Sequence, residues 1–270
     1  MTLSVFYQHL VEAARERNLP IQEVCRLAKE MGYTMVELDF DALASDASIP
    51  AILREAGLSV SSIYCFFKFD EAHDEERIAS LIQWAQRIGA GRVMPIPGFF
   101  HAEDEEGREE EMERMLSSME ALAAEADKAG ITVTIEDFDS AISPIRCSAL
   151  MLRFLNRIPS LRATFDTGNF RFSAEPEEEA FAALKDRIAH VHLKDRTVAP
   201  DYGDHPLIAM DGAPLYPCPV GSGMIPMDWI LAQLKAMGYE GALVTEHFGC
   251  RDTIAAMKKS AEYIRERWNA

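Results

Sequence analysis

The segment Gly130-Ile-Thr-Val-Thr-Ile-Glu-Asp-Phe138 is a run of β-branched residues that ends in two acids and an aromatic residue. Branched and threonine side chains favour a strand, and a run this apolar is typical of a strand covered on both faces. The preceding segment, Glu106–Ala129, has apolar residues at three- and four-residue spacing and stops at Gly130. This pattern predicts an amphipathic helix with a glycine at its end. The whole unit therefore predicts a helix followed by a buried strand with acids at its carboxyl end.

The same alternation extends along the chain in both directions. Strands are predicted at Leu3–His9, Val36–Phe40, Ser59–Phe67, Arg92–Gly98, Thr132–Phe138, Arg162–Asp166, Ile188–Lys194 and Ala242–His247. Helices are predicted at Pro20–Met31, Ser48–Ala56, Glu75–Ile88, Glu106–Ala129, Ser148–Arg157, Glu177–Asp186, Met227–Met237 and Thr253–Trp268. The irregular stretch Arg196–Pro226 is predicted to be a lid or a wall of the substrate site.

Eight strands that alternate with helices indicate an α/β chain, residues 1–270, folded as one (β/α)8 TIM barrel domain. A doubly wound open sheet shares this alternation. It usually has a glycine-rich phosphate turn after an early strand, and no such turn appears here. The barrel is therefore the fold that we expect.

Composition narrows the classes of partner. The chain has 270 residues, of which 48% are hydrophobic, and 44 acids against 27 bases give a formal net charge of −17. A surface this acidic repels phosphate backbones, so nucleic acid is not an expected partner. The five cysteines are scattered without a Cys-x-x-Cys pair, which suits a reducing compartment and argues against a thiolate zinc site.

The sequence also predicts where the protein works. Its first residues lack the pattern of a signal peptide, and no run reaches the ~18–20 apolar residues that a membrane span needs. We therefore expect a cytoplasmic protein without a membrane partner. Aromatic residues expected at the surface near Phe99 and Tyr202 leave room for a homo-oligomer.

Four consecutive predicted strands each carry a metal-binding side chain toward the carboxyl end: Glu136, Asp166, His192 and Glu246. The carboxyl ends of barrel strands converge on the face where catalytic groups collect. Carboxylate oxygens and an imidazole nitrogen are suitable ligands for hard or borderline divalent cations. Three buried carboxylates without a cation would also cost several kcal/mol. The sequence therefore predicts one divalent metal ion, and Mn²⁺, Mg²⁺, Co²⁺ and Zn²⁺ all remain open.

Other residues near the strand ends are predicted to contact a substrate. Lys194 follows His192 by two positions, so its side chain points to the same face of the strand. There it is placed to bind a carboxylate, phosphate or enediolate oxygen with help from Arg196, or to form a rim salt bridge with Asp195. The remaining candidates, at the ends of the second and fourth strands, are Glu37 and His101.

Several motifs resemble those of the xylose isomerase-like TIM-barrel superfamily, in particular its sugar phosphate isomerase/epimerase branch. They are Ile-Glu-Asp-Phe at 135–138, Phe-Asp-Thr-Gly-Asn-Phe at 165–170, His-Val-His-Leu-Lys-Asp at 190–195 and Pro-Val-Gly-Ser-Gly-Met-Ile-Pro-Met-Asp-Trp at 219–229, which leads into Val-Thr-Glu-His at 244–247. The strand–helix rhythm covers nearly the whole chain, but these motifs lie mostly in its second half. The resemblance implies an enzyme that acts on carbohydrates with the help of a metal ion.

The resemblance also implies roles for the four strand-end residues. Ketose 3-epimerases of this family use glutamate, aspartate, histidine and glutamate as metal ligands, in that strand order, which implies Glu136, Asp166, His192 and Glu246 here. In the family the two glutamates also transfer the proton, through an enediolate that the metal stabilises. Glu136 and Glu246 are thereby implied as the catalytic pair, without a choice of which acts first.

One position departs from the epimerase pattern. Family epimerases often have a substrate-contacting histidine three residues after the aspartate ligand, where this chain has Asn169. Asparagine can hydrogen-bond a hydroxyl but cannot transfer a proton at neutral pH, and it can also simply cap the turn. The same asparagine argues against the endonuclease IV branch. That branch also needs an Asp-x-His before the glycine pair of the 219–229 motif, where this chain has Leu215-Tyr-Pro217.

We therefore expect an isomerase or epimerase of a sugar, sugar phosphate or sugar acid. Two alternatives remain. One is a metal-dependent dehydratase of a keto-inositol or keto-sugar acid, because dehydration also begins with proton removal beside a carbonyl. The other is a sugar-binding barrel without catalysis. The substrate itself is not readable from the sequence, because specificity lies in loops.

Overall fold

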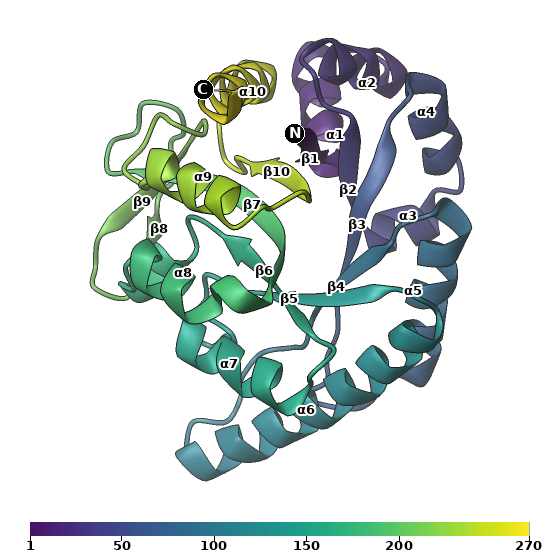
Figure 1. The fold of residues 1–270 in the computed structure, drawn as a ribbon, viewed down its shortest axis with the longest axis vertical. Helices are drawn as coiled ribbons and strands as arrows, with labels where there is room; N and C mark the ends of the chain where they lie inside the picture. The colour runs from purple at the N-terminus through teal and green to yellow at the C-terminus, as the bar shows by residue number, and fades with distance from the viewer. Residues whose placement is uncertain (270) are drawn as a thin grey trace.

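The computed structural model describes residues 1–269, and a ring of parallel strands occupies its centre (Figure 1). The eight strands of the ring are β1 (Thr2–Phe6), β2 (Met35–Asp39), β3 (Ser59–Phe66), β4 (Arg92–Ile96), β5 (Thr132–Glu136), β6 (Arg162–Asp166), β7 (Ile188–Thr197) and β10 (Ala242–Glu246). Neighbours pair in parallel in chain order, and β10 pairs with both β7 and β1. These last pairings close the ring and confirm the predicted TIM barrel.

Helices surround the strands on the outside (Figure 1). They are α1 (Tyr7–Arg17), α2 (Ile21–Glu30), α3 (Phe40–Ser45), α4 (Ile49–Ala56), α5 (Glu75–Ile88), α6 (Glu105–Lys128), α7 (Ser148–Arg157), α8 (Glu177–Leu184), α9 (Met227–Ala236) and α10 (Thr253–Asn269). Short 3-10 turns, η1 (Phe170–Ser173) and η2 (Lys185–Arg187), flank α8. The predicted glycine stop of α5 is present: Gly89 adopts a left-handed backbone with φ of 72°, which costs glycine little.

The predicted first strand, Leu3–His9, is too long. β1 ends at Phe6, and α1 begins at Tyr7. Within α1, Tyr7, Leu10 and Ala13 recur every three residues on the buried face, which is a helical period. The apolar start of the chain runs into this helix without a turn residue, so the boundary was missed. The short helix α3 was also not predicted.

The stretch predicted to be irregular, Arg196–Pro226, contains a small antiparallel addition. Strand β9 (Pro214–Cys218) pairs with the end of β7, and β8 (Leu207–Ile208) pairs with β9. The carboxylate of Asp195 accepts hydrogen bonds from the backbone N–H groups of Gly221, Gly223 and Ile225, at 2.9, 2.9 and 3.2 Å. The loop that follows β9 is therefore held against the carboxyl end of β7.

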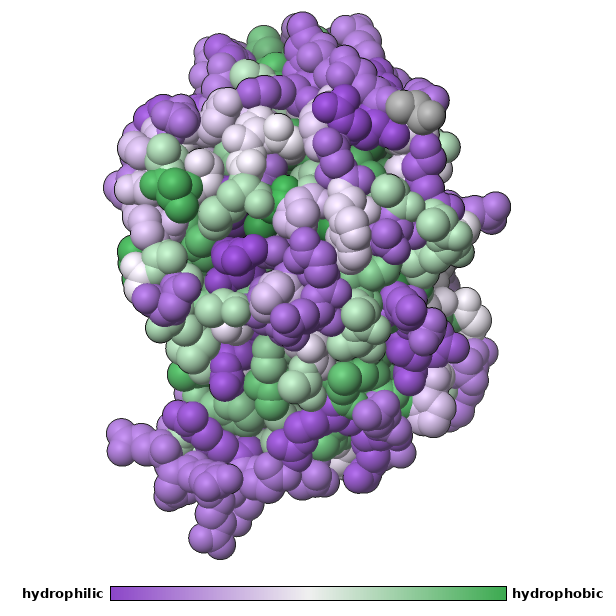
Figure 2. All heavy atoms as spheres, turned by 60° about the vertical axis from the view of Figure 1, so that its left-hand side comes forward, coloured by the Kyte–Doolittle hydropathy of each residue, from purple (hydrophilic) through white to green (hydrophobic). Residues whose placement is uncertain are grey.

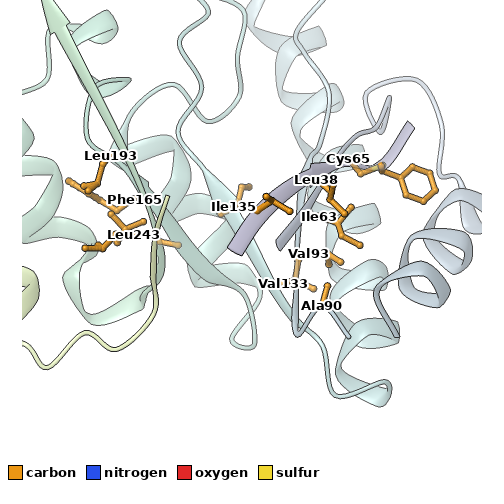
Figure 3. Packing of buried hydrophobic residues seen from close by; sticks show 14 of the residues in the cluster. Leu38, Ile63, Cys65, Ala90, Val93, Val133, Ile135, Phe165, Leu193 and Leu243 are labelled. Atoms are coloured by element: carbon orange, nitrogen blue, oxygen red, sulfur yellow. The ribbon is translucent and has the colours of Figure 1, made fainter. Parts of the chain in front are cut away.

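Alternation along the strands separates an apolar outer face from a mixed, more polar inner face. Leu38, Ile63, Val93, Ile135 and Leu193 belong to the buried hydrophobic cluster, part of which Figure 3 shows. The residues between them point inward; for example, the Thr134 and Thr164 hydroxyls are hydrogen-bonded at 2.8 Å inside the barrel. The apolar face packs under the helices, and the polar face delivers the last side chain of several strands to the barrel mouth.

Hydrophilic residues dominate the face of the molecule that Figure 2 shows, with apolar areas scattered among them. Within residues 1–269, every helix is too short or too polar to pass through a lipid bilayer.

Candidate metal centre and substrate pocket

Four consecutive barrel strands bring Glu136, Asp166, His192 and Glu246 together. One donor atom from each residue lies within 4.8 Å of the corresponding atoms of the other three. Glu136, Asp166 and Glu246 are the last residues of their strands, and Asp166 pairs in register with His192. All four side chains are buried. The convergence results directly from the strand order, because neighbouring strands of a closed barrel place their ends at one face.

Three buried polar atoms of the cluster are incompletely satisfied. Oδ2 of Asp166 has no partner, and Oε1 of Glu136 and Nδ1 of His192 have only their contact with each other. His192 Nδ1 contacts Glu136 and lies 3.8 Å from Oε2 of Glu246. Buried polar groups are normally paired, so four converging ligand residues that include the unpaired Oδ2 of Asp166 fit a bound cation. The residues present therefore suit a divalent metal ion.

The second oxygen of Asp166 is already occupied. Its Oδ1 accepts hydrogen bonds from the backbone N–H groups of Gly168 and Asn169, both at 2.8 Å. The turn after β6 thus fixes the carboxylate and directs Oδ2 into the cluster. A ligand held in this way needs little reorganisation when it binds a cation.

Burial controls the electrostatics of these acids in the protein without a cation. It raises the pKa of Asp166 to about 8 and also raises the pKa of Glu136, although the His192 imidazole opposes the second shift. Burial acts to lower the pKa of His192, but the carboxylates of Glu136 and Glu37 outweigh it and raise that pKa well above its ordinary value. Positive charge at the cluster would therefore stabilise the ionised acids.

A pocket of about 350 Å³ adjoins this cluster. Its lining combines an apolar set with a polar, mostly charged set: Phe6, Tyr64, Phe66, Met94, Ile96, Phe138 and Phe248, together with Glu136, Asp139, Asn169, Lys194, Arg196 and Glu246. The size suits a small molecule. Among the four clustered residues, the two glutamates line the pocket.

Lys194 points into the pocket and joins the polar residues there. Its Nζ contacts Oε1 of Glu246 and donates a 2.7 Å hydrogen bond to Oδ1 of Asn169. Asp139 lies 3.8 Å from the same ammonium and 2.6 Å from Nη2 of Arg196. The alternative salt bridge between Lys194 and Asp195 does not form, because backbone N–H groups surround the Asp195 carboxylate.

Asn169 is held in one orientation. Its Nδ2 donates to the backbone carbonyl oxygen of Asp137 at 2.8 Å, which leaves Oδ1 to accept from Lys194. Asn169 is therefore a buried residue of the pocket wall that positions the Lys194 ammonium. Its backbone N–H also belongs to the turn that holds the Asp166 carboxylate.

The structure places two sequence-predicted substrate residues outside the pocket. Glu37 is fully buried, and its Oε2 lies 2.8 Å from Nε2 of His190 and 3.0 Å from Nε2 of His192. His101 has a 62% exposed side chain whose Nε2 lies 3.2 Å from Oδ2 of Asp70. Glu37 thus faces the barrel interior beside the imidazoles, and the His101 side chain is exposed to solvent. Neither residue lines the pocket, so their prediction as substrate-contacting residues is not met there.

Asp139 and the aromatic residues that line the pocket were not predicted from the sequence. Asp139 follows β5 in a loop without a regular period, so nothing in the sequence shows that it reaches Arg196, 57 residues further on. Tyr64 and Phe66 are alternate residues near the end of β3. Alternation together with the strand-end position is the signal that could have placed both of them at the barrel mouth.

Residues 25–267 match a family model described as the xylose isomerase-like TIM barrel. The chain belongs to this family. Family membership confirms the resemblance that the motifs indicated. No curated protein sequence matches the chain.

Solved structures of similar shape cover almost the whole barrel at low sequence identity. The probable 3-DHS dehydratase AsbF of Bacillus anthracis has a TM-score of 0.75 and 16% identity, over 98% of this chain and 99% of that one. A D-allulose 3-epimerase from Methylomonas sp. also has 0.75 and 16%, over 99% and 97%. The Escherichia coli 3-keto-D-glucoside 4-epimerase YcjR has 0.67 and 19%, over 91% and 94%. At these identities, the similarity establishes a shared fold.

Proposed function

We propose that this family member is a divalent-metal-dependent isomerase or epimerase of a small carbohydrate. The observation that carries the proposal is the convergence of Glu136, Asp166, His192 and Glu246 beside a pocket that both glutamates line. These four residues would hold the metal ion, which when bound supplies a Lewis acid for the oxygens of an enediolate. The structural resemblance to sugar epimerases supports the substrate class.

The two glutamates are assigned to proton transfer. Both are buried and line the pocket, which places their carboxylates within reach of a bound substrate. The Lys194 ammonium contacts Glu246 and orients its carboxylate in the pocket, and we assign Glu246 to proton removal. Burial raises the pKa of Glu136, which suits the group that returns a proton. In the reverse reaction the two roles exchange.

The remaining polar residues of the pocket orient the substrate. Asn169 and Lys194 form a hydrogen-bonded pair in the wall, and a substrate hydroxyl can replace one partner of that pair. Arg196 is held by Asp139, which places its guanidinium at the same wall. Aromatic side chains, among them Phe66 and Phe138, supply an apolar surface for the C–H groups of a sugar and exclude water.

Solvent-isotope exchange with a substrate panel tests this function. Ketoses, sugar acids and sugar phosphates would be incubated with Mn²⁺ in D₂O, and carbon-bound deuterium in the product would be measured. Glu246→Gln is expected to lower turnover about 10²- to 10⁴-fold, the contribution of one positioned base. Glu240→Gln, at an exposed glutamate just before β10, is the matched control. Metal binding without turnover on any of these compounds would instead indicate a non-catalytic sugar-binding barrel.

Dehydration is the second candidate, because Lys194 offers an ammonium proton to a departing hydroxyl in the same pocket. The structural resemblance to the probable dehydratase AsbF supports this reading. Both reactions would begin at Glu246. The same D₂O incubation separates them, since isomerisation keeps the substrate mass apart from deuterium, whereas dehydration removes one water.

A further inference from the structure

A line of hydrogen-bonding groups, all buried except the half-buried Arg92, crosses the barrel interior beside the candidate metal centre. It comprises Arg92 on β4, His190 and His192 on β7, and Glu37 on β2. Both imidazoles and the Glu37 side chain are fully buried. None of these groups except His192 belongs to the proposed ligand set, so Arg92, His190 and Glu37 need a separate explanation.

Arg92 determines which nitrogen of His190 carries the proton. The guanidinium only donates hydrogen bonds, and its Nη1 lies 3.3 Å from Nδ1 of His190. His190 Nδ1 is therefore the acceptor, and the ring hydrogen is on Nε2. That nitrogen lies 2.8 Å from Oε2 of Glu37 and donates to it. The other Arg92 nitrogen, Nη2, donates to the Ala189 carbonyl oxygen at 2.9 Å and fixes the guanidinium in place.

The same carboxylate oxygen determines the tautomer of His192. Nε2 of His192 lies 3.0 Å from Oε2 of Glu37, and a carboxylate can only accept, so Nε2 carries the hydrogen. Without a cation, the contact with the Glu136 carboxylate requires a hydrogen on Nδ1 as well. A bound cation would displace that hydrogen and leave the lone pair of His192 on Nδ1. This is the atom that contacts Glu136 and faces Glu246. Without an acceptor at Nε2, the hydrogen could move to Nδ1 and point at the site where a cation would bind.

We propose that Glu37 is a positioning residue that fixes His192 as an Nδ1 metal ligand, with His190 and Arg92 holding Glu37 in turn. The inference rests on the proposed function only in requiring that a divalent cation binds at His192. A carboxylate that accepts from the far nitrogen of a ligating imidazole fixes the ring and strengthens the ligand. A second cation between Glu37 and the two imidazoles does not fit, because their Nε2 atoms are hydrogen-bond donors and the Arg92 guanidinium is adjacent.

The tautomers can be observed directly in the full-length protein. Long-range ¹H–¹⁵N NMR spectra of histidine-labelled, Zn²⁺-loaded protein are expected to show Nε2–H for both His190 and His192, with His192 Nδ1 bound to the metal. An Nδ1–H signal from His192 in the Zn²⁺-loaded protein would overturn the proposal. If no Zn²⁺ or Mn²⁺ binds, the proposed function fails. Spectra of the metal-free protein then decide separately whether Nε2 of both rings donates to Glu37.

Variants at Glu37 separate positioning from a purely structural role. Glu37→Leu removes the acceptor and is expected to weaken Mn²⁺ binding about 10- to 100-fold in equilibrium dialysis. Glu37→Gln retains a carbonyl oxygen for both imidazoles, because the second carboxylate oxygen, Oε1, has no partner to lose. It is therefore expected to keep Mn²⁺ affinity within about threefold of the wild type.

Glu111→Leu is the matched control. Glu111 is also a buried glutamate, but its carboxylate accepts from the backbone N–H groups of His101 and Ala102 and not from any of the four proposed ligands. This variant is expected to lower stability and leave Mn²⁺ affinity unchanged. Equal Mn²⁺ affinity in Glu37→Leu and the wild type would contradict the proposal. If Glu37→Leu does not fold, a large loss of affinity in Glu37→Gln would contradict it as well.

Discussion

Replacing Asp166 by asparagine should stabilise the metal-free protein and remove its response to metal. Oδ1 of Asp166 accepts from two backbone N–H groups, whereas Oδ2 has no partner and faces the other acids. An asparagine amide can keep its oxygen at the first position and place its NH₂ group at the second. The substitution therefore preserves the local hydrogen bonds, removes a buried carboxyl group and adds a donor toward Glu136 and Glu246.

The stabilisation by Asp166→Asn is expected to increase with pH. Burial, the largest effect, raises the pKa of Asp166 from 3.8 to about 8. The folded protein therefore keeps this proton over a pH range in which the unfolded chain loses it. Since the unfolded state binds fewer protons, the free energy of unfolding falls as pH rises from about 4 to about 8. At about 1.4 kcal/mol per pH unit, the advantage of Asp166→Asn should grow by up to about 4 kcal/mol between pH 5 and pH 8.

Urea unfolding of dialysed protein in EDTA, repeated from pH 5 to pH 8, measures this difference. A second series with Mn²⁺ at about 100 times its dissociation constant should stabilise the wild type by about 2.7 kcal/mol and leave Asp166→Asn nearly unchanged. An advantage of the variant in EDTA that is independent of pH would refute the burial argument. Equal stabilisation of both proteins by Mn²⁺ would remove Asp166 from the ligand set.

Three further outcomes are expected. Lys194→Met should lower the free energy of unfolding by about 3–5 kcal/mol in urea titrations, because Glu246 loses its buried cationic partner; a change below 1 kcal/mol would contradict the pairing. Asp195→Ala removes the acceptor of the backbone N–H groups in the 219–225 loop. Limited proteolysis should therefore cut this loop at least tenfold faster than in the wild type, and equal rates would show that other contacts hold the loop. Dialysis against EDTA should abolish turnover, and added Mn²⁺ should restore it; activity that survives complete metal removal would refute metal dependence.

The local pattern of apolar residues in the sequence determined most of the fold. Branched runs between amphipathic segments located all eight barrel strands, because the side-chain periods of strands and helices differ and survive in any context. The boundary near Tyr7 was misplaced, since an apolar strand ran into an amphipathic helix without a turn residue between them. The helix ends were closer, because glycine carries a specific backbone conformation at such positions.

The candidate metal residues were also accessible from the sequence. Glu136, Asp166 and Glu246 end their strands, and neighbouring strands of a parallel barrel bring such ends to one face whatever their separation in the chain. Lys194 followed from alternation with His192, but its contacts did not. Its predicted alternative partner, Asp195, is instead surrounded by backbone N–H groups from a loop about 26 to 30 residues later.

The tertiary structure alone decided the role of Glu37. The sequence placed this acid at a strand end, where it resembled any other pocket residue. Its partners His190 and His192 lie on a non-adjacent strand more than 150 residues away, across the inside of the barrel. Such a contact depends on the stagger of the strands around the ring and on a register shift beside Glu37, between β2 and β3. Periodicity describes which face a side chain occupies, whereas the height of that side chain inside the barrel arises only when the ring closes.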